Sequence, residues 1–395
     1  MTSPSRPDLL VLSSSADGHH PEYLRWILEG ARCHGVERIA VGGPERLLSH
    51  AGVRLQLDGV RGFPLPETDA AREATTYGKR ERFMQAAVQR AVETLRPRAV
   101  LLTTFDAAQI GLATGLRFRF PVALSGILMR PPLRAPTSTA RGRLRTALKR
   151  TLLRTAMRNP HISAVFTLDP DAVAPLERMR VPAIYLPDPV EPPTPGIDSD
   201  AVRARFGIPP DHQIAVLFGS LEHRKGFVEL LRALTLLPPD RAARLTTLIV
   251  GTAYEGTRAA LVAAVAEARA AGAAVAFEEA FLPDDELASI VDAAAVILAP
   301  YRGHVGSSGV LLRAAAAGVP VLGPSTGQMG REIQRHQLGV PVDTSDVGEI
   351  ARGLINALDG VGFDPRSAAA YAAAHSPERF ADALFSPPSP LAPPA

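Results

Sequence analysis

The chain has 395 residues, 46% of them hydrophobic and 21% charged, with a formal net charge of +3 and one cysteine, Cys33. This length favours two domains, and a lone cysteine excludes a disulfide framework and a cysteine metal cluster. No apolar run reaches the roughly 18 residues that span a bilayer, and residues 1–8 lack a basic-then-apolar leader, so we expect a cytoplasmic protein.

In chain order, short apolar runs alternate with longer helical patterns in both halves of the sequence. The runs of the first half lie at residues 8–14, 37–42, 98–104, 122–127 and 163–168, and those of the second at 213–219, 245–251, 273–279, 295–300 and 319–323. This alternation predicts βαβ units and parallel sheets. We therefore expect an α/β fold of two doubly wound Rossmann-like domains that face a central cleft, where ligands meet the carboxyl ends of the strands.

Two proline-rich stretches mark the predicted boundaries. We expect PDPVEPPTPG at 187–196 to be a linker and SPPSPLAPPA at 386–395 to be a disordered tail. The predicted domains are therefore residues 1–190 and residues 191–385.

The loop after the first apolar run contains Asp17, Gly18, His19 and His20 and precedes a helix. A histidine there could polarise a hydroxyl group or brace a departing phosphate, because its usual pKa lies near neutrality. We take His19 and His20 as candidate catalytic residues, and Asp17 and Asp106 as candidates for binding an acceptor. An Asp-Gly turn with a capping histidine explains the same loop without function.

Residues 130–158 contain nine basic residues and no acidic one. A predicted helix in this stretch has an apolar face and, largely opposite, a basic face; the first holds Leu144, Leu148, Leu152 and Thr155, and the second Lys149, Arg150 and Arg154. This pattern is typical of a helix on an anionic membrane surface, so the protein could be peripheral on the inner membrane face. The alternatives are a helix packed on the sheet or a stretch that binds an anionic acceptor. Without interleaved aromatic residues, we expect no nucleic-acid partner.

A cationic pair, Arg224 and Lys225, follows the apolar run that ends at Gly219. Only three of the 43 basic residues are lysine, so a lysine directly after an arginine departs from the preference of this chain. Arginine binds a phosphate as a fork and lysine as a mobile point charge, so together they could neutralise a diphosphate. A solvated basic turn is the commoner explanation of Arg-Lys alone.

A turn of small residues, Gly306, Ser307, Ser308 and Gly309, lies between another apolar run and an alanine-rich helix. Its backbone N–H groups would stand at the helix N-terminus, where the helix dipole favours an anion. An ordinary helix start with Ser308 as the cap is the alternative.

Three runs in the second half resemble the donor-binding lobe of retaining GT-B glycosyltransferases of family 4. They are FGSLEHRKGFVELLRAL, FLPDDELASIVDAAAVILAPY, and GSSGVLLRAAAAGVPVLGPSTGQMGREI with LGVPV after it, within a match over roughly residues 210–385 that includes HSPERFADAL. The resemblance implies that Arg224 and Lys225 neutralise the donor diphosphate. It also implies that Gly219, the turn at 306–309 and Glu332 contribute to donor binding.

One departure from the family pattern concerns two glutamates that usually flank this turn. Val305 and Arg313 occupy their positions, and neither accepts a hydroxyl hydrogen bond as a carboxylate would. Arg313 could instead reach a phosphate or an acidic sugar, or it could be an ordinary surface arginine.

The resemblance implies a glycosyltransferase whose residues 191–385 bind a nucleotide-sugar donor and whose residues 1–190 bind a saccharide, lipid-linked glycan or small-molecule acceptor. A GT-B nucleotide-sugar epimerase and a non-catalytic nucleotide-binding homologue are the alternatives. The sequence has no Gly-x-Ser-x-Gly, His-Glu-x-x-His or Asp-x-Asp motif. We therefore expect neither a serine hydrolase nor a metal-dependent transferase, and no metal or cofactor.

Overall fold

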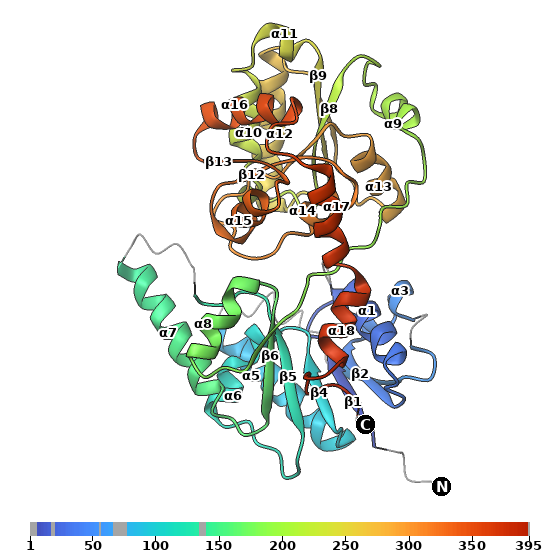
Figure 1. The fold of residues 1–395 in the computed structure, drawn as a ribbon, viewed down its shortest axis with the longest axis vertical. Coiled ribbons are helices and arrows are strands. Elements are labelled where there is room, and N and C mark those ends of the chain that lie inside the picture. The colour runs from blue at the N-terminus through green and yellow to red at the C-terminus, as the bar shows by residue number, and fades with distance from the viewer. Residues whose placement is uncertain (1–5, 17–19, 55–56, 66–76, 134–139, 394–395) are drawn as a thin grey trace. The chain divides into compact units, whose positions relative to one another are not determined.

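The computed structural model describes residues 6–16, 20–54, 57–65, 77–133 and 140–393. Its chain divides into two compact units (Figure 1). Unit 1 comprises Met1–Asp188 together with Pro377–Ala395, and unit 2 comprises Pro189–Ser376. None of the helices in the described part of the chain is long and apolar enough to cross a membrane.

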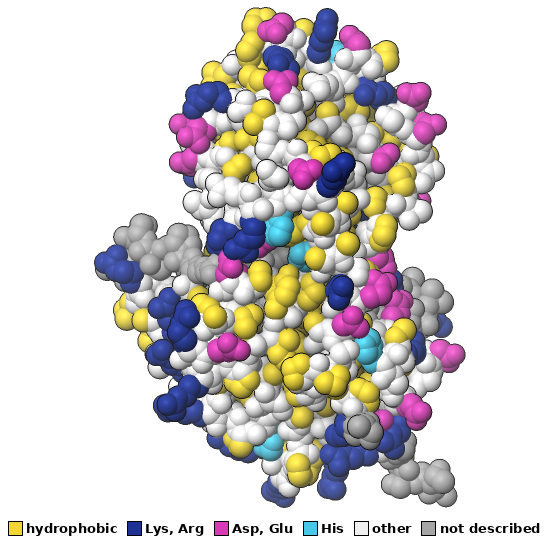
Figure 2. All heavy atoms as spheres, viewed as in Figure 1, with side chains coloured by type: hydrophobic (Ala, Val, Ile, Leu, Met, Phe, Trp, Pro, Cys, Tyr) yellow, Lys and Arg dark blue, Asp and Glu magenta, His cyan; other side chains and the backbone are white. Residues whose placement is uncertain are grey.

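Unit 1 contains a seven-stranded parallel sheet in the order β3-β2-β1-β4-β5-β6-β7. Its strands are β1 Leu9–Leu12, β2 Ile39–Pro44, β3 Arg61–Leu65, β4 Ala99–Leu102, β5 Ala123–Leu128, β6 Ile162–Thr167 and β7 Ala183–Tyr185. Its helices include α1 His20–Cys33, α2 Glu45–Leu48, α3 Ala51–Arg54, α5 Tyr77–Leu95, α6 Gln109–Thr114, α7 Ala140–Ala156, α8 Val173–Arg178 and α18 Pro377–Phe385, with short 3-10 turns at Phe105–Ala107 and Pro170–Ala172. Lysine and arginine side chains gather on the side where α7 and α8 lie (Figure 2).

Unit 2 contains a six-stranded parallel sheet in the order β10-β9-β8-β11-β12-β13. Its strands are β8 Gln213–Phe218, β9 Leu245–Val250, β10 Val275–Glu278, β11 Val296–Leu298, β12 Val321–Pro324 and β13 Gly339–Val342. Its helices are α9 Ser199–Phe206, α10 Phe227–Leu234, α11 Pro239–Ala242, α12 Glu255–Ala270, α13 Asp284–Asp292, α14 Gly309–Ala316, α15 Gly327–Arg335, α16 Val347–Leu358 and α17 Pro365–Ala374, with a 3-10 turn at His223–Lys225.

Each sheet is covered by helices on both faces, which explains why its strands are continuous apolar runs. In β1, Leu10 and Leu12 pack with residues of α5 in one core, whereas Leu9 and Val11 pack with residues of α1 in another. Strand β8 divides its apolar side chains between two cores in the same way. Since both faces are buried, successive side chains are all apolar. The predicted fold of two doubly wound parallel α/β domains is confirmed.

The sheets also contain strands that the apolar runs did not predict. Strands β3 and β7 form the two edges of the first sheet, and β13 forms an edge of the second. Four of the five residues in β3 are exposed or half-buried, and β7 has only three residues. The exposure of β3 and the shortness of β7 explain why neither strand is a long apolar run in the sequence.

The C-terminal segment differs from the prediction, because Pro377–Ala395 belongs to unit 1. The Phe380 ring of α18 lies 5.5 Å from the ring of Tyr23 and 6.5 Å from that of Trp26, centroid to centroid. Helix α1 approaches closely at Gly30, where a Cβ atom would lie 2.6 Å from the Cβ of Ala381. This packing of apolar side chains brings the chain back to unit 1.

The predicted disordered tail, residues 386–395, also differs from the structure over its described part. Leu391 is 2% exposed and belongs to the same core as α1 and α18. Ser389, 7% exposed, donates a hydrogen bond to the carbonyl of Leu384. Proline prevents a regular helix here but does not prevent a leucine from being buried.

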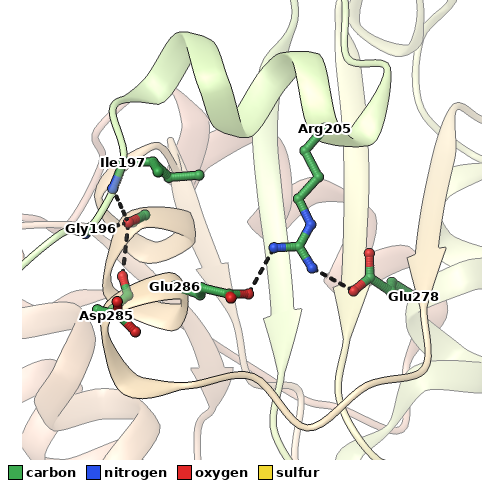
Figure 3. A network of polar contacts seen from close by, with 7 residues as sticks. Gly196, Ile197, Arg205, Glu278, Asp285 and Glu286 are labelled. Atoms are coloured by element: carbon green, nitrogen blue, oxygen red, sulfur yellow. Dashed lines mark hydrogen bonds and ion pairs between the residues drawn. The ribbon is translucent and has the colours of Figure 1, made fainter.

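The segment after the unit boundary is bound to unit 2 by polar contacts (Figure 3). The amides of Gly196 and Ile197 donate to the hydroxyl of Ser289 at 2.9 and 3.1 Å. Arg205 of α9 donates to Glu286 of α13 at 2.8 Å and to Glu278 of β10 at 2.7 Å. These contacts connect α9 to the sheet edge and to α13.

Candidate functional site

Two of the loops predicted from the second half lie side by side at the carboxyl edge of the unit 2 sheet. Strands β8 and β11 are paired neighbours in this sheet, so the loops that follow them are adjacent. The amide of Arg302 donates to the carbonyl of Arg224 at 2.8 Å. A Cβ atom on Gly226, which has a positive φ of 69°, would lie 2.1 Å from the carbonyl oxygen of Pro300. Only glycine permits such a close approach of the two backbones, and this contact holds the two loops together.

Lys225 is a buried cation at this junction, with 6% of its surface exposed. Its ammonium donates to the hydroxyl of Tyr301 at 2.5 Å and to the carbonyl of Phe218 at 3.5 Å, and lies 4.3 Å from the centroid of the Tyr301 ring. An ammonium has three protons. Within the described part of the chain, these two oxygens accept hydrogen bonds from two of the three N–H groups, so one N–H remains for a ligand.

Arg224 differs from its neighbour, because its charge is already paired. Its Nε and Nη2 donate to the two carboxylate oxygens of Glu222 at 2.9 and 3.2 Å. Its side chain is 43% exposed, and the Glu222 carboxylate raises the pKa of Arg224. The two cations of the predicted pair therefore have different environments: Lys225 is buried, and Arg224 is paired with Glu222 at the surface.

The small-residue turn opens α14 as predicted. Ser308 is the N-cap residue, and its hydroxyl accepts from the amide of Leu311 at 3.4 Å. The amides of Gly306, Ser308 and Gly309 donate to no acceptor among the described residues. The cap and the anion site are thus compatible, because the cap uses a side-chain oxygen while these N–H groups stay available at the positive end of the helix.

Two further residues of this edge, Tyr301 and His304, were missed in the sequence. The rings of Tyr301 and His304 meet edge to face, 5.2 Å apart. Nε2 of His304 lies 3.0 Å from the carbonyl of Ser307, so it carries the proton and donates. Burial lowers the pKa of His304, and the charges of Arg224 and Lys225 lower it further. A neutral His304 therefore stabilises the turn through its hydrogen bond to Ser307. The only signal for this residue in the sequence was its position after a buried strand.

Arg313 and Glu332 lie on the helices that follow β11 and β12. Arg313, one turn into α14, donates to Asp284 of α13 at 2.9 Å, and its side chain is 33% exposed. This aspartate is a partner that the sequence did not suggest. Glu332 of α15 is 5% exposed and lies 3.3 Å from Nε2 of His336.

The candidates of the first half lie in unit 1, and only some can be located. Asp17 and His19 fall outside the described residues. Nδ1 of His20, the first residue of α1, lies 3.0 Å from the hydroxyl of Ser13 at the end of β1. Asp106, after β4, accepts from the amide of Met129 after β5 at 2.8 Å, and burial raises its pKa. Both side chains therefore stand at the carboxyl edge of their sheet.

Among the residues that the structure describes, no group of three or more His, Cys, Asp or Glu side chains could hold a metal ion. The groups at the unit 2 edge are, instead, of the kind that suits an anion. They are a buried ammonium, a second cation and a helix N-terminus.

Comparison with known proteins shows what this unit resembles. Residues 212–360 match the model of the family described as glycosyl transferases group 1. This range contains the loops after β8 and β11. This match places a glycosyl transferases group 1 domain in unit 2.

Solved structures of glycosyltransferases show that the two-domain fold spans nearly the whole chain. A sucrose-phosphate synthase from Thermosynechococcus elongatus is 17% identical, with a TM-score of 0.67 over 96% of this chain and 95% of that one. An α,α-trehalose-phosphate synthase from Burkholderia xenovorans is 12% identical, with a TM-score of 0.71 over 96% and 98%. HepE from Anabaena, solved with UDP, is 16% identical, with a TM-score of 0.65 over 95% and 98%. No curated protein sequence matches the chain.

Proposed function

We propose that this protein is a glycosyltransferase that moves a sugar from a nucleoside-diphosphate sugar bound by unit 2 to an acceptor bound by unit 1, with retention of anomeric configuration. The observation that carries the proposal is the buried ammonium of Lys225 in one loop, together with the open amides of the α14 N-terminus that follow the adjacent loop. A buried cation needs an anion to offset its desolvation. A diphosphate satisfies both the ammonium and the amides.

The donor class is supported by proteins of the same fold. HepE has been solved with UDP and with UDP-glucose, and the trehalose-phosphate synthase is described as UDP-forming. In this chain, Lys225, Arg224 and the amides of residues 306–309 would hold the diphosphate, with Gly219 beside them. A Cβ atom on Gly219 would lie 3.6 Å from Nζ of Lys225, so glycine leaves the approach to the ammonium open.

The proposed catalysis is mainly electrostatic. When the bond between the sugar and the diphosphate breaks, negative charge develops on the departing phosphate oxygen. Donors that already point at this oxygen lower the barrier without reorganising. Lys225 is held by Tyr301 before any ligand arrives, and His304 holds the turn by its bond to Ser307.

Arg313 and Glu332 are proposed to contact the donor beyond its phosphates. Arg313 replaces the family's carboxylate, and its pairing with Asp284 keeps its charge partly offset. A donor sugar that carries a carboxylate or phosphate would compete with Asp284 for the guanidinium. Changing Arg313 to Glu should weaken the binding of such a donor, because like charges would then meet.

The acceptor is proposed to bind at the carboxyl edge of the unit 1 sheet, where His20 and Asp106 lie. His19 and Asp17, from the same loop as His20, are proposed to contribute there. A carboxyl whose pKa is raised by burial can accept a hydroxyl proton more readily than an exposed one. A saccharide, a lipid-linked glycan and a small molecule all present such hydroxyl groups.

The test is incubation of the purified protein with a panel of nucleotide sugars that differ in base and sugar. We expect slow hydrolysis of one donor, with release of its nucleoside diphosphate, and proton NMR of the fresh product should show the anomer of the donor. Release of a free epimer with no nucleoside diphosphate would instead establish the epimerase. Binding without any turnover of the whole panel, with and without candidate acceptors, would contradict the proposal.

A further inference from the structure

Helix α7 of unit 1 is anchored at its C-terminal end. Leu153 and Ala156 are completely buried and belong to the core that covers one face of the sheet. The guanidinium of Arg150 donates to the carbonyls of Pro132 and Leu133, both at 2.9 Å. The buried face of the helix is therefore the one that contains residues 153 and 156.

The opposite face of α7 exposes two leucines. Leu144 and Leu148 are each 62% exposed, among the most exposed large apolar side chains of the described structure. Residues four apart in a helix lie one above the other on the same face, so the two form one apolar strip. The exposed Ala147 and Thr151 lie beside it. Helix packing inside unit 1 does not account for these leucines.

Basic side chains border this strip. The stretch from residue 107 to residue 168 contains no aspartate or glutamate. Lys149 and Arg154 are exposed and form no ion pair with any described residue. In Figure 2, arginine and lysine side chains gather next to hydrophobic ones on the side of unit 1 where α7 lies. Their long stems can reach sideways from the strip while the charged ends stay in water.

We propose that the outward face of α7 docks on an anionic lipid bilayer. The leucines enter the boundary between headgroups and acyl chains, and the lysine and arginine side chains bind the phosphate groups of the lipids. This inference goes beyond glycosyl transfer and does not depend on it, because it rests on the exposed face of unit 1 alone.

Charge and apolar surface together favour this occupant over others. A nucleic acid would match the basic residues but would leave Leu144 and Leu148 against water or phosphate. A second copy of this chain would bring the same positive charge onto the face, which repels. An anionic bilayer offers negative charge and an apolar interior at the depth of one helix radius.

The experiment is co-sedimentation of the full chain with vesicles of phosphatidylcholine alone, or of phosphatidylcholine and phosphatidylglycerol in about equal amounts. We expect binding to the anionic vesicles at low salt and release in about 1 M salt, where the Debye length falls to about 3 Å. The paired variant K149Q/R154Q should bind about thirtyfold more weakly. The variant L144Q/L148Q should lose at least about tenfold, because its apolar strip is gone.

Matched controls come from unit 2. Leu236 is 58% exposed, and Arg232 and Arg244 are exposed. The variants L236Q and R232Q/R244Q should bind the vesicles like the unchanged chain. Equal binding to neutral and anionic vesicles would overturn the proposal. The proposal would also be overturned if L144Q/L148Q bound the anionic vesicles as tightly as the unchanged chain. It would be overturned as well if the chain bound no vesicles at low salt but was retained on an immobilised nucleic acid. Donor hydrolysis is read separately, so failure here leaves the proposed function untouched.

Discussion

Replacing Lys225 by methionine should abolish most of the catalysis, whereas replacing the adjacent Arg224 by glutamine should not. Methionine keeps the length of the side chain and can pack on the Tyr301 ring, so the fold should survive. The two cations differ in burial and pairing. Lys225 is 6% exposed, while Arg224 is 43% exposed and bound through two hydrogen bonds to Glu222.

Those environments set the expected magnitudes. A unit charge about 4 Å from an anion contributes about 4 kcal/mol at the effective dielectric constant of a partly buried site, but about 1 kcal/mol in bulk water. Since about 1.4 kcal/mol is a tenfold change in rate, losing Lys225 should lower kcat by several hundredfold. Losing Arg224, which is solvated and already paired, should lower it by about fivefold.

The assay is release of nucleoside diphosphate from the donor found in the panel, measured as kcat and KM. Lys149, an exposed lysine of α7, provides the control, and Lys149→Met should hydrolyse the donor at the unchanged rate without membranes. Circular dichroism establishes that each variant is folded. A folded Lys225→Met enzyme with kcat near normal would refute the reasoning, and so would an Arg224→Gln enzyme as damaged as the lysine variant.

Three further predictions follow from the same contacts. Tyr301→Phe removes the hydroxyl that orients the buried ammonium, so kcat should fall by about tenfold or more; steady-state kinetics of this variant and of its combination with the lysine variant should show no additional loss in the pair. Burial lowers the pKa of His304, so on acidification the unfolded chain takes up this proton before the folded chain does. The free energy of unfolding should therefore decrease as the pH drops below about 6.5. In urea titrations the His304→Gln variant should show a smaller decrease, and a pH dependence identical to that of the unchanged chain would contradict this assignment. Gly30→Ala places a Cβ atom 2.6 Å from that of Ala381 and should lower the free energy of unfolding by about 1–3 kcal/mol. The control Gly256→Ala, whose Cβ would lie in open space on α12, should raise the free energy of unfolding slightly in the same denaturant experiment. Stabilisation by both variants would show that α1 and α18 have room to separate.

The site was predictable from sequence where its chemistry depends on neighbouring residues. Arg224 and Lys225 after β8, and residues 306–309 before α14, are strand-end and helix-start positions that short patterns reveal. Tyr301 and His304 could not be assigned in this way. Their significance lies in contacts with Lys225 and Ser307, and only the pairing of β8 with β11 brings Tyr301, 76 residues along the chain, onto the ammonium.

Helix α7 shows the same limit within one element. The sequence placed Leu144, Leu148, Leu152 and Thr155 on one face, largely opposite the basic residues. It could not decide which face would pack. The structure buries Leu153 and exposes Leu144 and Leu148, because the helix is held by residues of its last turns and by the bonds of Arg150 to the preceding loop.

By itself, the sequence determined the two parallel sheets, since strands buried on both faces need unbroken apolar runs. It also determined the position of the cationic pair and of the small-residue turn at the ends of such strands. Only the tertiary structure decided that Lys225 is buried against Tyr301 while Arg224 is neutralised by Glu222. It alone returned α18 to unit 1, where Phe380 packs on Tyr23. These outcomes depend on which distant side chains share a volume, and a local pattern of residues does not contain that information.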